Sequence, residues 1–157
     1  MTDCLIRTAT RRDEDALREM RAEVGWAVEF TARAFEEMEY GARIVCVADV
    51  DGRAVGSVQV LWDSDDPEMA DGHHVAHLSD LVVDAAYRGR GIGRQLAEHV
   101  ENLARARGYD AMTLDVNQSA PETQRRYERW GYRYYRQSIS PWGSWLNGMR
   151  KTLVAPR

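Results

Sequence analysis

The sequence contains very little lysine, cysteine and proline. Its 157 residues include four prolines, two cysteines and the single lysine Lys151. A phosphate loop of the Gly-Lys-Ser/Thr type is excluded, because no lysine lies near a glycine-rich turn. Both cysteines, Cys4 and Cys46, fall in apolar, strand-like segments. We therefore expect packed thiols and no disulfide framework.

Long hydrophobic runs and excess positive charge are also lacking. No apolar run approaches the roughly 18 residues of a membrane span, and the first residues show no secretory hydrophobic core. We expect a cytoplasmic protein with no membrane partner. There are 21 basic and 25 acidic residues, a net charge of -4, which disfavours nucleic acid as a partner. The length predicts one domain, residues 1–157, with a sizeable core.

The spacing of apolar residues predicts an α/β domain with a mixed sheet. We expect a capped helix after Thr10 that carries its apolar residues at helical spacing, and a strong hairpin turn at Asp51-Gly52. The element order is β-α-α-β-β-β-α-β-α-β-β. Strands are expected at 5–7, 43–50, 53–62, 75–83, 111–116, 132–136 and 145–153, and further helices at 28–40, 95–107 and 121–130.

A run rich in glycine and arginine, 87–94, joins the apolar strand 78–83 to the helix expected at 95–107. Glycines at alternate positions remove the Cβ atoms that would keep an anion away from the backbone. Unpaired N–H groups at a helix N-terminus favour negative charge. We predict a pyrophosphate site formed by Arg88, Gly89, Arg90, Gly91, Ile92, Gly93 and Arg94.

Several alternatives compete with this interpretation. Glycine-rich turns between a strand and a helix also occur without a ligand. A dinucleotide fingerprint would need glycine at position 94, where the sequence has Arg94. The basic run could also be a nucleic-acid patch, which the acidic balance disfavours. A metal site at His73 and His77 is disfavoured, because four residues of a strand span roughly 13 Å.

Two blocks resemble motifs of the GCN5-related N-acetyltransferase (GNAT) family. The segment 81–93 is similar to that family's Arg/Gln-x-x-Gly-x-Gly/Ala pyrophosphate motif with its preceding strand. Asn117, followed ten positions later by Tyr127 and then by 128–132, is similar to the family's Asn…Leu-Tyr-Glu-Lys-x-Gly-Phe segment. The resemblance covers essentially the whole chain. It implies a single GNAT-like domain, with a mixed central sheet flanked by helices.

The chain departs from the family pattern at three positions. Ala85 stands where the family commonly has proline, Ala120 where a second asparagine is common, and Arg126 where an apolar residue precedes the tyrosine. These departures affect individual contacts to coenzyme A. They leave the glycine loop and Tyr127 intact.

The resemblance implies an acetyl-CoA-dependent N-acetyltransferase, a transferase of the acyltransferase class, in which an amine attacks the thioester directly. Acetyl-CoA would be the cosubstrate, with no metal. The acceptor would be a small-molecule or peptide amine, and the acidic segment 63–71 favours a cationic one. That segment could also be a solvated loop that only aids solubility. A homodimer is left open, and a non-catalytic module that senses acyl-CoA is the alternative function.

Roles for individual residues also follow from the resemblance. The backbone N–H groups of Leu81, Val82 and Val83 would polarise the thioester carbonyl. Asn117 would bond the pantetheine arm, and Tyr127 would give a proton to the departing thiolate. Considered by itself, Tyr127 could equally be a packed tyrosine.

The general base is less well defined by the sequence. Asp80 is the candidate catalytic residue, because it lies on the strand beside the expected thioester site. A carboxylate in a buried strand is costly unless it is partnered, so a structural hydrogen bond is an equal alternative for Asp80. His77 and a chain of water molecules are further candidates for the base.

Overall fold

The computed structural model describes residues 3–153, which form an α/β fold with a mixed sheet. Its strands are hydrogen-bonded in the order β1-β2-β3-β4-β5-β7-β6. The β4–β5 pair is parallel, whereas β1–β2, β2–β3, β5–β7 and β6–β7 are antiparallel. The expected element order is confirmed. The elements are β1 (Cys4–Thr8), η1 (Arg11–Asp13), α1 (Glu14–Glu23), α2 (Phe30–Glu39), β2 (Arg43–Val50), β3 (Arg53–Leu61), β4 (Val75–Val83), η2 (Ala85–Tyr87), α3 (Ile92–Ala106), β5 (Ala111–Asn117), α4 (Pro121–Arg129), β6 (Arg133–Ile139) and β7 (Trp145–Thr152).

The chain divides into two compact units. Among the described residues, unit 1 contains those up to Leu61 together with Leu78–Leu103, and unit 2 contains Trp62–His77 and the chain from Ala104 onward. Strand β4 passes from unit 2 into unit 1 after His77.

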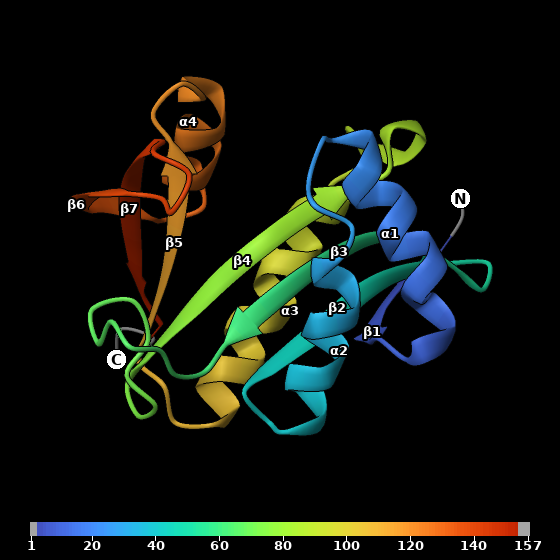
Figure 1. Cartoon of the computed structure of the whole chain (residues 1–157), viewed down its shortest axis with the longest axis horizontal. Coiled ribbons are helices and arrows are strands. Elements are labelled where there is room, and N and C mark those ends of the chain that lie inside the picture. The colour runs from blue at the N-terminus through green and yellow to red at the C-terminus, as the bar shows by residue number, and fades with distance from the viewer. Residues whose placement is uncertain (1–2, 154–157) are drawn as a thin grey trace. The chain divides into compact units, whose positions relative to one another are not determined.

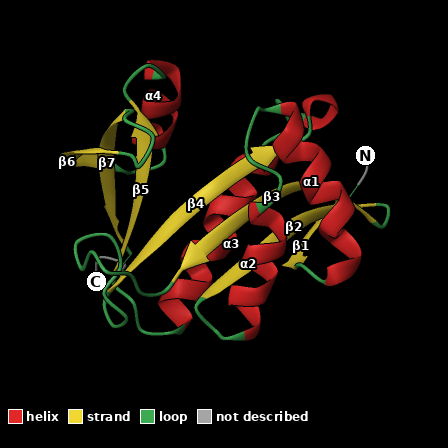
Figure 2. Cartoon of the chain, in the orientation of Figure 1, coloured by secondary structure: helices red, strands yellow, loops and turns green. Residues whose placement is uncertain are grey.

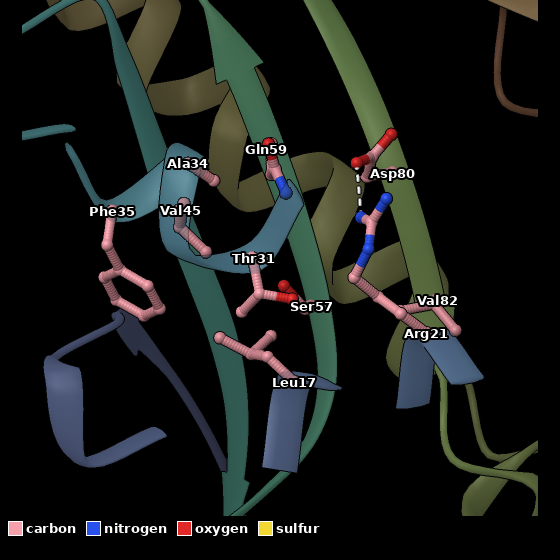
Figure 3. Close-up of a pocket in the computed structure, with 10 residues that line it drawn as sticks. All are labelled: Leu17, Arg21, Thr31, Ala34, Phe35, Val45, Ser57, Gln59, Asp80 and Val82. Carbon is pink, nitrogen blue, oxygen red and sulfur yellow. Dashed lines mark hydrogen bonds and ion pairs between the residues drawn. The ribbon is translucent and has the colours of Figure 1, made fainter. Parts of the chain in front are cut away.

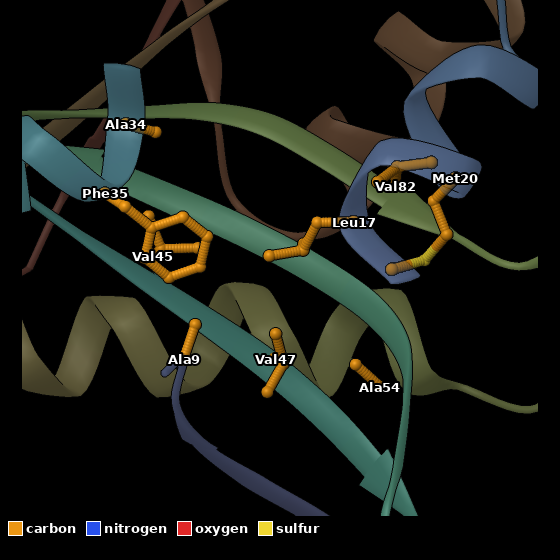
Figure 4. Close-up of a cluster of buried hydrophobic side chains, with 9 residues drawn as sticks. All are labelled: Ala9, Leu17, Met20, Ala34, Phe35, Val45, Val47, Ala54 and Val82. Carbon is orange, nitrogen blue, oxygen red and sulfur yellow. The ribbon is translucent and has the colours of Figure 1, made fainter. Parts of the chain in front are cut away.

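Unit 1 packs its helices on both faces of its strands. Figures 1 and 2 show α1 and α2 on one side of β2 and β3, and α3 on the other. At the back, α3 approaches closely: a Cβ added at Gly56 on β3 would lie 3.1 Å from the Leu96 side chain. At the front is a cluster of buried apolar side chains (Figure 4), in which each fully buried Val, Leu, Phe or Met contributes roughly 1.5–3 kcal/mol. Its members are Ala9, Leu17, Met20, Ala34, Phe35, Val45, Val47, Ala54 and Val82.

The turns of unit 1 follow from the residues at their ends. Asp51 and Gly52 both adopt left-handed backbone, with φ of 54° and 85°, as a tight hairpin between β2 and β3 requires. Gly41, with φ of 77°, ends α2. Helix α3 begins at Ile92, so the expected start at residue 95 was three residues too late. The short 3-10 turn η2 was not predicted.

Unit 2 contains the parallel contact of the sheet and its C-terminal strands. Val75–His77 of β4 pair with Ala111–Thr113 of β5, and β5 then pairs with β7 along its length. Helix α4 begins at Pro121 in the first-turn position expected of proline. Only Trp62 among the five tryptophans belongs to the buried apolar residues of the described chain.

A partly buried ion-pair network lies at the β1 edge of unit 1. The Arg7 guanidinium donates to both oxygens of Asp13 at 2.8 Å and to Asp49 at 2.9 Å. The Asp13 carboxylate also accepts the Thr10 N–H at 2.8 Å, which completes a capping box at the start of η1. The hydrogen bond from Arg7 lowers the pKa of Asp13 below its usual value.

Replacing Asp13 by asparagine should destabilise the protein most at neutral pH. Because the folded-state pKa is lowered, the carboxylate stabilises the fold above its unfolded-state pKa near 3.8 and loses that effect as the pH falls further. We expect Asp13→Asn to lower the free energy of unfolding by about 1–3 kcal/mol at pH 7. The difference should shrink at pH 3. Urea unfolding measures this, with the exposed Asp15→Asn as control; an equal loss at both pH values would contradict the account.

Candidate functional site

The glycine loop of unit 1 leaves its backbone open. Gly89 and Gly91 have φ of 77° and 81°, and a Cβ added to either would meet nothing within 4 Å. Helix α3 starts at Ile92, so Gly93 and Arg94 lie in its first turn, where N–H groups have no partner within the helix. The loop therefore presents main-chain donors and the positive end of a helix dipole on one exposed surface.

The loop is held to the sheet by Asp84. The Asp84 N–H donates to the Val55 carbonyl of β3 at 2.8 Å, and its carboxylate accepts the Ala86 N–H at 3.0 Å. Arg53 lies 3.6 Å from the same carboxylate. These contacts fix the end of β4 and the first turn of the loop before the glycines begin.

Each arginine predicted at this site has a partner within unit 1. Arg88 donates to the Val83 carbonyl at 2.9 Å and to Glu23 at 3.3 Å. Arg90 donates to the Ala86 carbonyl at 3.2 Å, and Arg94 donates to Glu98 at 3.0 Å. Since these side chains are engaged locally, the backbone amides are the groups that the loop most directly offers to an anion.

Strand β4 carries an unusual residue at its centre. Among the described residues, Asp51 and Asp80 are the two non-glycine residues with positive φ. Asp51 belongs to a hairpin turn, but Asp80, with φ of 54°, lies inside a strand. A residue of this conformation interrupts the alternation of a strand and re-aims the groups that follow it. The groups that follow are the backbones of Leu81, Val82 and Val83.

Arg21 of α1 holds Asp80 by an ion pair. Its Nη1 lies 2.6 Å from the Asp80 carboxylate, and its Nε donates to the Ala27 carbonyl at 2.8 Å. The guanidinium lies 5.3 Å from the Trp26 ring centre and 6.0 Å from that of Phe30. The partner expected for Asp80 is thus present. Arg21 itself was not predicted, although a charged residue on the apolar stripe of a helix is a recognisable signal.

A small pocket of unit 1 lies beside this ion pair (Figure 3). Leu17 and Arg21 from α1, Thr31 from α2 and Asp80 from β4 contribute to its wall. Its other lining residues are Ala34, Phe35, Val45, Ser57, Gln59 and Val82. Sequence reasoning missed the polar members, although Ser57 and Gln59 alternate on one face of an otherwise apolar strand.

Tyr127 lies in unit 2, on the last turns of α4. Its side chain is 8% exposed, and its ring makes edge contacts with Trp130 and Tyr132, with ring centres 5.3 Å and 5.8 Å away. Burial raises the pKa of the phenol to about 12. The hydroxyl therefore keeps its proton throughout the neutral range, as a proton donor must.

Asn117 ends β5 in the same unit. Its side-chain oxygen accepts the N–H and the hydroxyl of Ser119, at 2.9 Å and 2.7 Å. These two donors fix the orientation of the amide, so the Asn117 Nδ2 group is the side that can serve a ligand.

His77 is tied into unit 2. The Thr113 hydroxyl donates its one proton to the Met69 carbonyl at 2.7 Å. It must therefore accept at the 2.9 Å contact with His77, which assigns the proton to Nδ1 of the imidazole. The Nε2 atom lies 4.0 Å from Asp115, whose pKa is raised by burial. This network accounts for His77 structurally.

Two carboxylates of the acidic segment 63–71 make contacts that stabilise the loop within unit 2. Asp66 pairs with Arg136 at 2.5 Å. Asp71 accepts three successive N–H groups, those of His73, His74 and Val75, and these bonds lower its pKa to about 2. The clustering seen in the sequence thus partly reflects how this loop is folded.

The chain belongs to the acetyltransferase (GNAT) family, whose model matches residues 10–132. A curated relative, the glucosamine 6-phosphate N-acetyltransferase of Trypanosoma brucei brucei, is 32% identical over 89 residues, which is 56% of this chain and 56% of that protein. The chain thus spans just over half the length of that relative. The resemblance inferred from the two sequence motifs is confirmed.

Solved structures confirm the fold. An N-acetyltransferase from Staphylococcus aureus Mu50 matches with a TM-score of 0.79 at 17% identity, over 97% of this chain and 99% of that one. The yncA protein from Salmonella typhimurium, solved with its cofactor acetyl-CoA, matches with a TM-score of 0.77 at 19% identity, over 99% and 98% of the two chains.

Two further findings concern residues 3–153. No helix in this range is long and apolar enough to cross a membrane. In the same range, no three side chains of histidine, cysteine, aspartate or glutamate form a group that could hold a metal ion.

Substitutions at Asp80 should separate its backbone from its carboxylate. Asparagine tolerates left-handed backbone and keeps an oxygen for Arg21, so Asp80→Asn should cost least in the free energy of unfolding. Asp80→Ala should be less stable than Asp80→Gly by up to about 1 kcal/mol, because alanine is strained at positive φ. The neighbouring Ser79 does not have positive φ. At that position the alanine variant should therefore be more stable than the glycine variant. Urea unfolding of the five variants measures this; alanine as stable as glycine at position 80 would contradict the assignment.

Proposed function

We propose that this protein is an acetyl-CoA-dependent N-acetyltransferase. The observation that carries the proposal is the open glycine loop of unit 1, with left-handed Gly89 and Gly91 directly before α3, in a chain of the GNAT family. Main-chain N–H groups of 88–94 bind the pyrophosphate of coenzyme A, where the helix dipole adds to the attraction. Arg88, Arg90 and Arg94 belong to the same segment, where their local partners leave the main chain as the principal ligand of the anion.

The thioester is activated by the backbone of β4. As the amine attacks, the carbonyl oxygen becomes negatively charged, and fixed N–H donors stabilise this charge. The residues after the left-handed Asp80 supply them: Leu81, Val82 and Val83. Asn117 donates through Nδ2 to the pantetheine arm. These roles use main-chain and amide donors, which need no change of protonation during the reaction.

The chemical step balances as follows. The acceptor ammonium loses one proton to a base, and the free amine forms a bond to the acetyl carbon. The C–S bond then breaks, and the sulfur leaves as a thiolate. Tyr127 protonates this thiolate and regains a proton as the second N–H proton of the attacking nitrogen is released. The high pKa of Tyr127, about 12, keeps the phenol protonated and ready to donate.

The acceptor is a primary amine. One relative is named for glucosamine 6-phosphate, an amino sugar, and an amine of this kind is consistent with the site. The Asp80 carboxylate, with its side chain 35% exposed, is a counter-charge that an arriving ammonium can reach. Asp80 is also the candidate general base.

A charge placed in the glycine loop should abolish cofactor binding. Gly91→Asp puts a carboxylate where the pyrophosphate binds, so the dissociation constant for acetyl-CoA should rise by more than about 100-fold, a cost of roughly 2.7 kcal/mol. Isothermal titration calorimetry measures the binding.

Gly143→Asp is the matched control for that variant. Gly143 also has left-handed backbone, with φ of 84°, and a Cβ there would also meet nothing within 4 Å. The substitution Gly143→Asp therefore introduces the same backbone strain and the same charge as Gly91→Asp, but outside the glycine loop. If both variants bind acetyl-CoA like the wild type, the pyrophosphate does not bind at 88–94.

Removing the phenol hydroxyl should slow turnover. Tyr127→Phe should lower kcat by roughly 10- to 1,000-fold with little change in acetyl-CoA affinity, because the proton is needed chiefly in the transition state. Tyr109→Phe is the matched control: Tyr109 is also 8% exposed, and its hydroxyl donates to the Trp62 carbonyl at 3.2 Å. Thiol release from acetyl-CoA with a productive amine reports kcat. Equal kcat for the wild type and Tyr127→Phe would show that Tyr127 only packs against its neighbours and does not donate the proton.

A further inference from the structure

Polar side chains are concentrated in the small pocket of unit 1 (Figure 3). Four residues of its lining are polar and almost fully buried, with exposures of 7% for Arg21, 3% for Thr31, 2% for Ser57 and 6% for Gln59. The rest of the lining is mostly apolar core. Buried polar groups destabilise a fold unless they are hydrogen-bonded, so this concentration needs an explanation.

Thr31 supplies the most direct indication of a ligand. Its hydroxyl oxygen is buried and has no hydrogen-bond partner within residues 3–153. A hydroxyl can donate one hydrogen bond and accept two. All of the hydrogen-bonding capacity of the Thr31 hydroxyl is therefore available to a group that enters the pocket.

Gln59 adds a donor on the same side. Arg43 donates to its side-chain oxygen at 2.6 Å. Because a guanidinium has only donors, this contact fixes the amide orientation and leaves the Gln59 Nε2 group as the free side. Figure 3 shows that nitrogen turned toward Thr31 and Ser57. The three residues together offer an amide donor and two hydroxyls.

The charges around the pocket indicate a neutral occupant. Arg21 is paired with Asp80 at 2.6 Å, and Arg43 is paired with Glu37 at 2.6 Å. A carboxylate or phosphate that entered the pocket would lose its hydration. Because both arginines are already paired, neither would offset this desolvation cost. The cavity is about 10 Å³, close to the least that one water molecule needs. An oxygen of hydroxyl size fits these limits.

We propose that Thr31, Ser57 and Gln59 form a subsite for a hydroxyl group of the acceptor, next to the carboxylate of Asp80. The acceptor is then an amino alcohol, whose ammonium lies at Asp80 and whose hydroxyl, separated from the nitrogen by two or three carbon atoms, enters the pocket. This inference rests on the proposed acetyl transfer, and it names the acceptor class. A purely aliphatic amine would leave the buried polar groups without partners, and an amino acid would bring an unpaired carboxylate.

Two acceptors of the same length test the subsite. 2-Aminoethanol and propylamine differ by a hydroxyl in place of a methyl group. For the wild type, kcat/KM should favour 2-aminoethanol by roughly 10- to 100-fold, because hydrogen-bonding groups discriminate against an analogue that leaves them unpaired. The isosteric Thr31→Val should reduce this ratio to within about threefold of one. Thr31→Ser, which keeps the hydroxyl, should retain most of it.

Other outcomes would overturn the subsite. These are equal kcat/KM for the two amines in the wild type, an unchanged ratio in Thr31→Val, or a higher kcat/KM for glycine or putrescine than for 2-aminoethanol. Ligand-observed NMR of the same two amines, without acetyl-CoA, measures binding separately from turnover. Hydroxyl-dependent binding that Thr31→Val removes, without acetylation of any amine, would support the subsite and contradict the acetyl transfer.

Discussion

Strand β4 enters left-handed backbone at Asp80, and a buried guanidinium from α1 holds that residue in place. The conformation alone costs about 1–2 kcal/mol for most residues, so it persists because surrounding contacts impose it. The Arg21–Asp80 pair links the first helix to the middle of the strand. It anchors the residue that directly precedes Leu81–Val83, and both of its members line the polar pocket. A single ion pair thus positions the groups proposed to act on both the thioester and the acceptor.

The proposed chemistry depends mainly on main-chain donors. The loop presents amides at the start of α3, and β4 presents amides after its left-handed residue. The loop needs glycine where φ is positive and the approach is close, whereas the β4 set needs the Arg21–Asp80 pair that holds its left-handed residue. Side chains are needed for proton transfer and for choosing the acceptor, roles that we assign to Tyr127 and to Thr31, Ser57 and Gln59. This division between main-chain and side-chain roles is consistent with the sequence. The chain keeps the glycine loop of its family and departs from the family pattern at Ala85 and Ala120.

Local patterns were sufficient to predict most of the fold. The bounds of β2 and β4 were predicted to the residue, and Asp51-Gly52 formed its hairpin turn. The start of α3 was predicted too late. Glycine disfavours a helix interior, so Gly93 indicated that the helix had not yet begun, but the first turn of a helix tolerates glycine. The pairing of Arg21 with Asp80 joins residues far apart in sequence, and no local pattern indicates which partner a buried charge will find. The pocket was missed for the same reason.

The central claim is that the main chain of 88–94 binds acetyl-CoA, and hydrogen–deuterium exchange tests it most directly. Amides of an exposed loop and a helix first turn exchange quickly, since few are hydrogen-bonded within the protein. Exchange followed by mass spectrometry, with and without saturating acetyl-CoA, should show strong slowing across 88–94. If acetyl-CoA binds while exchange across 88–94 stays unchanged, the cofactor lies elsewhere and the account is wrong.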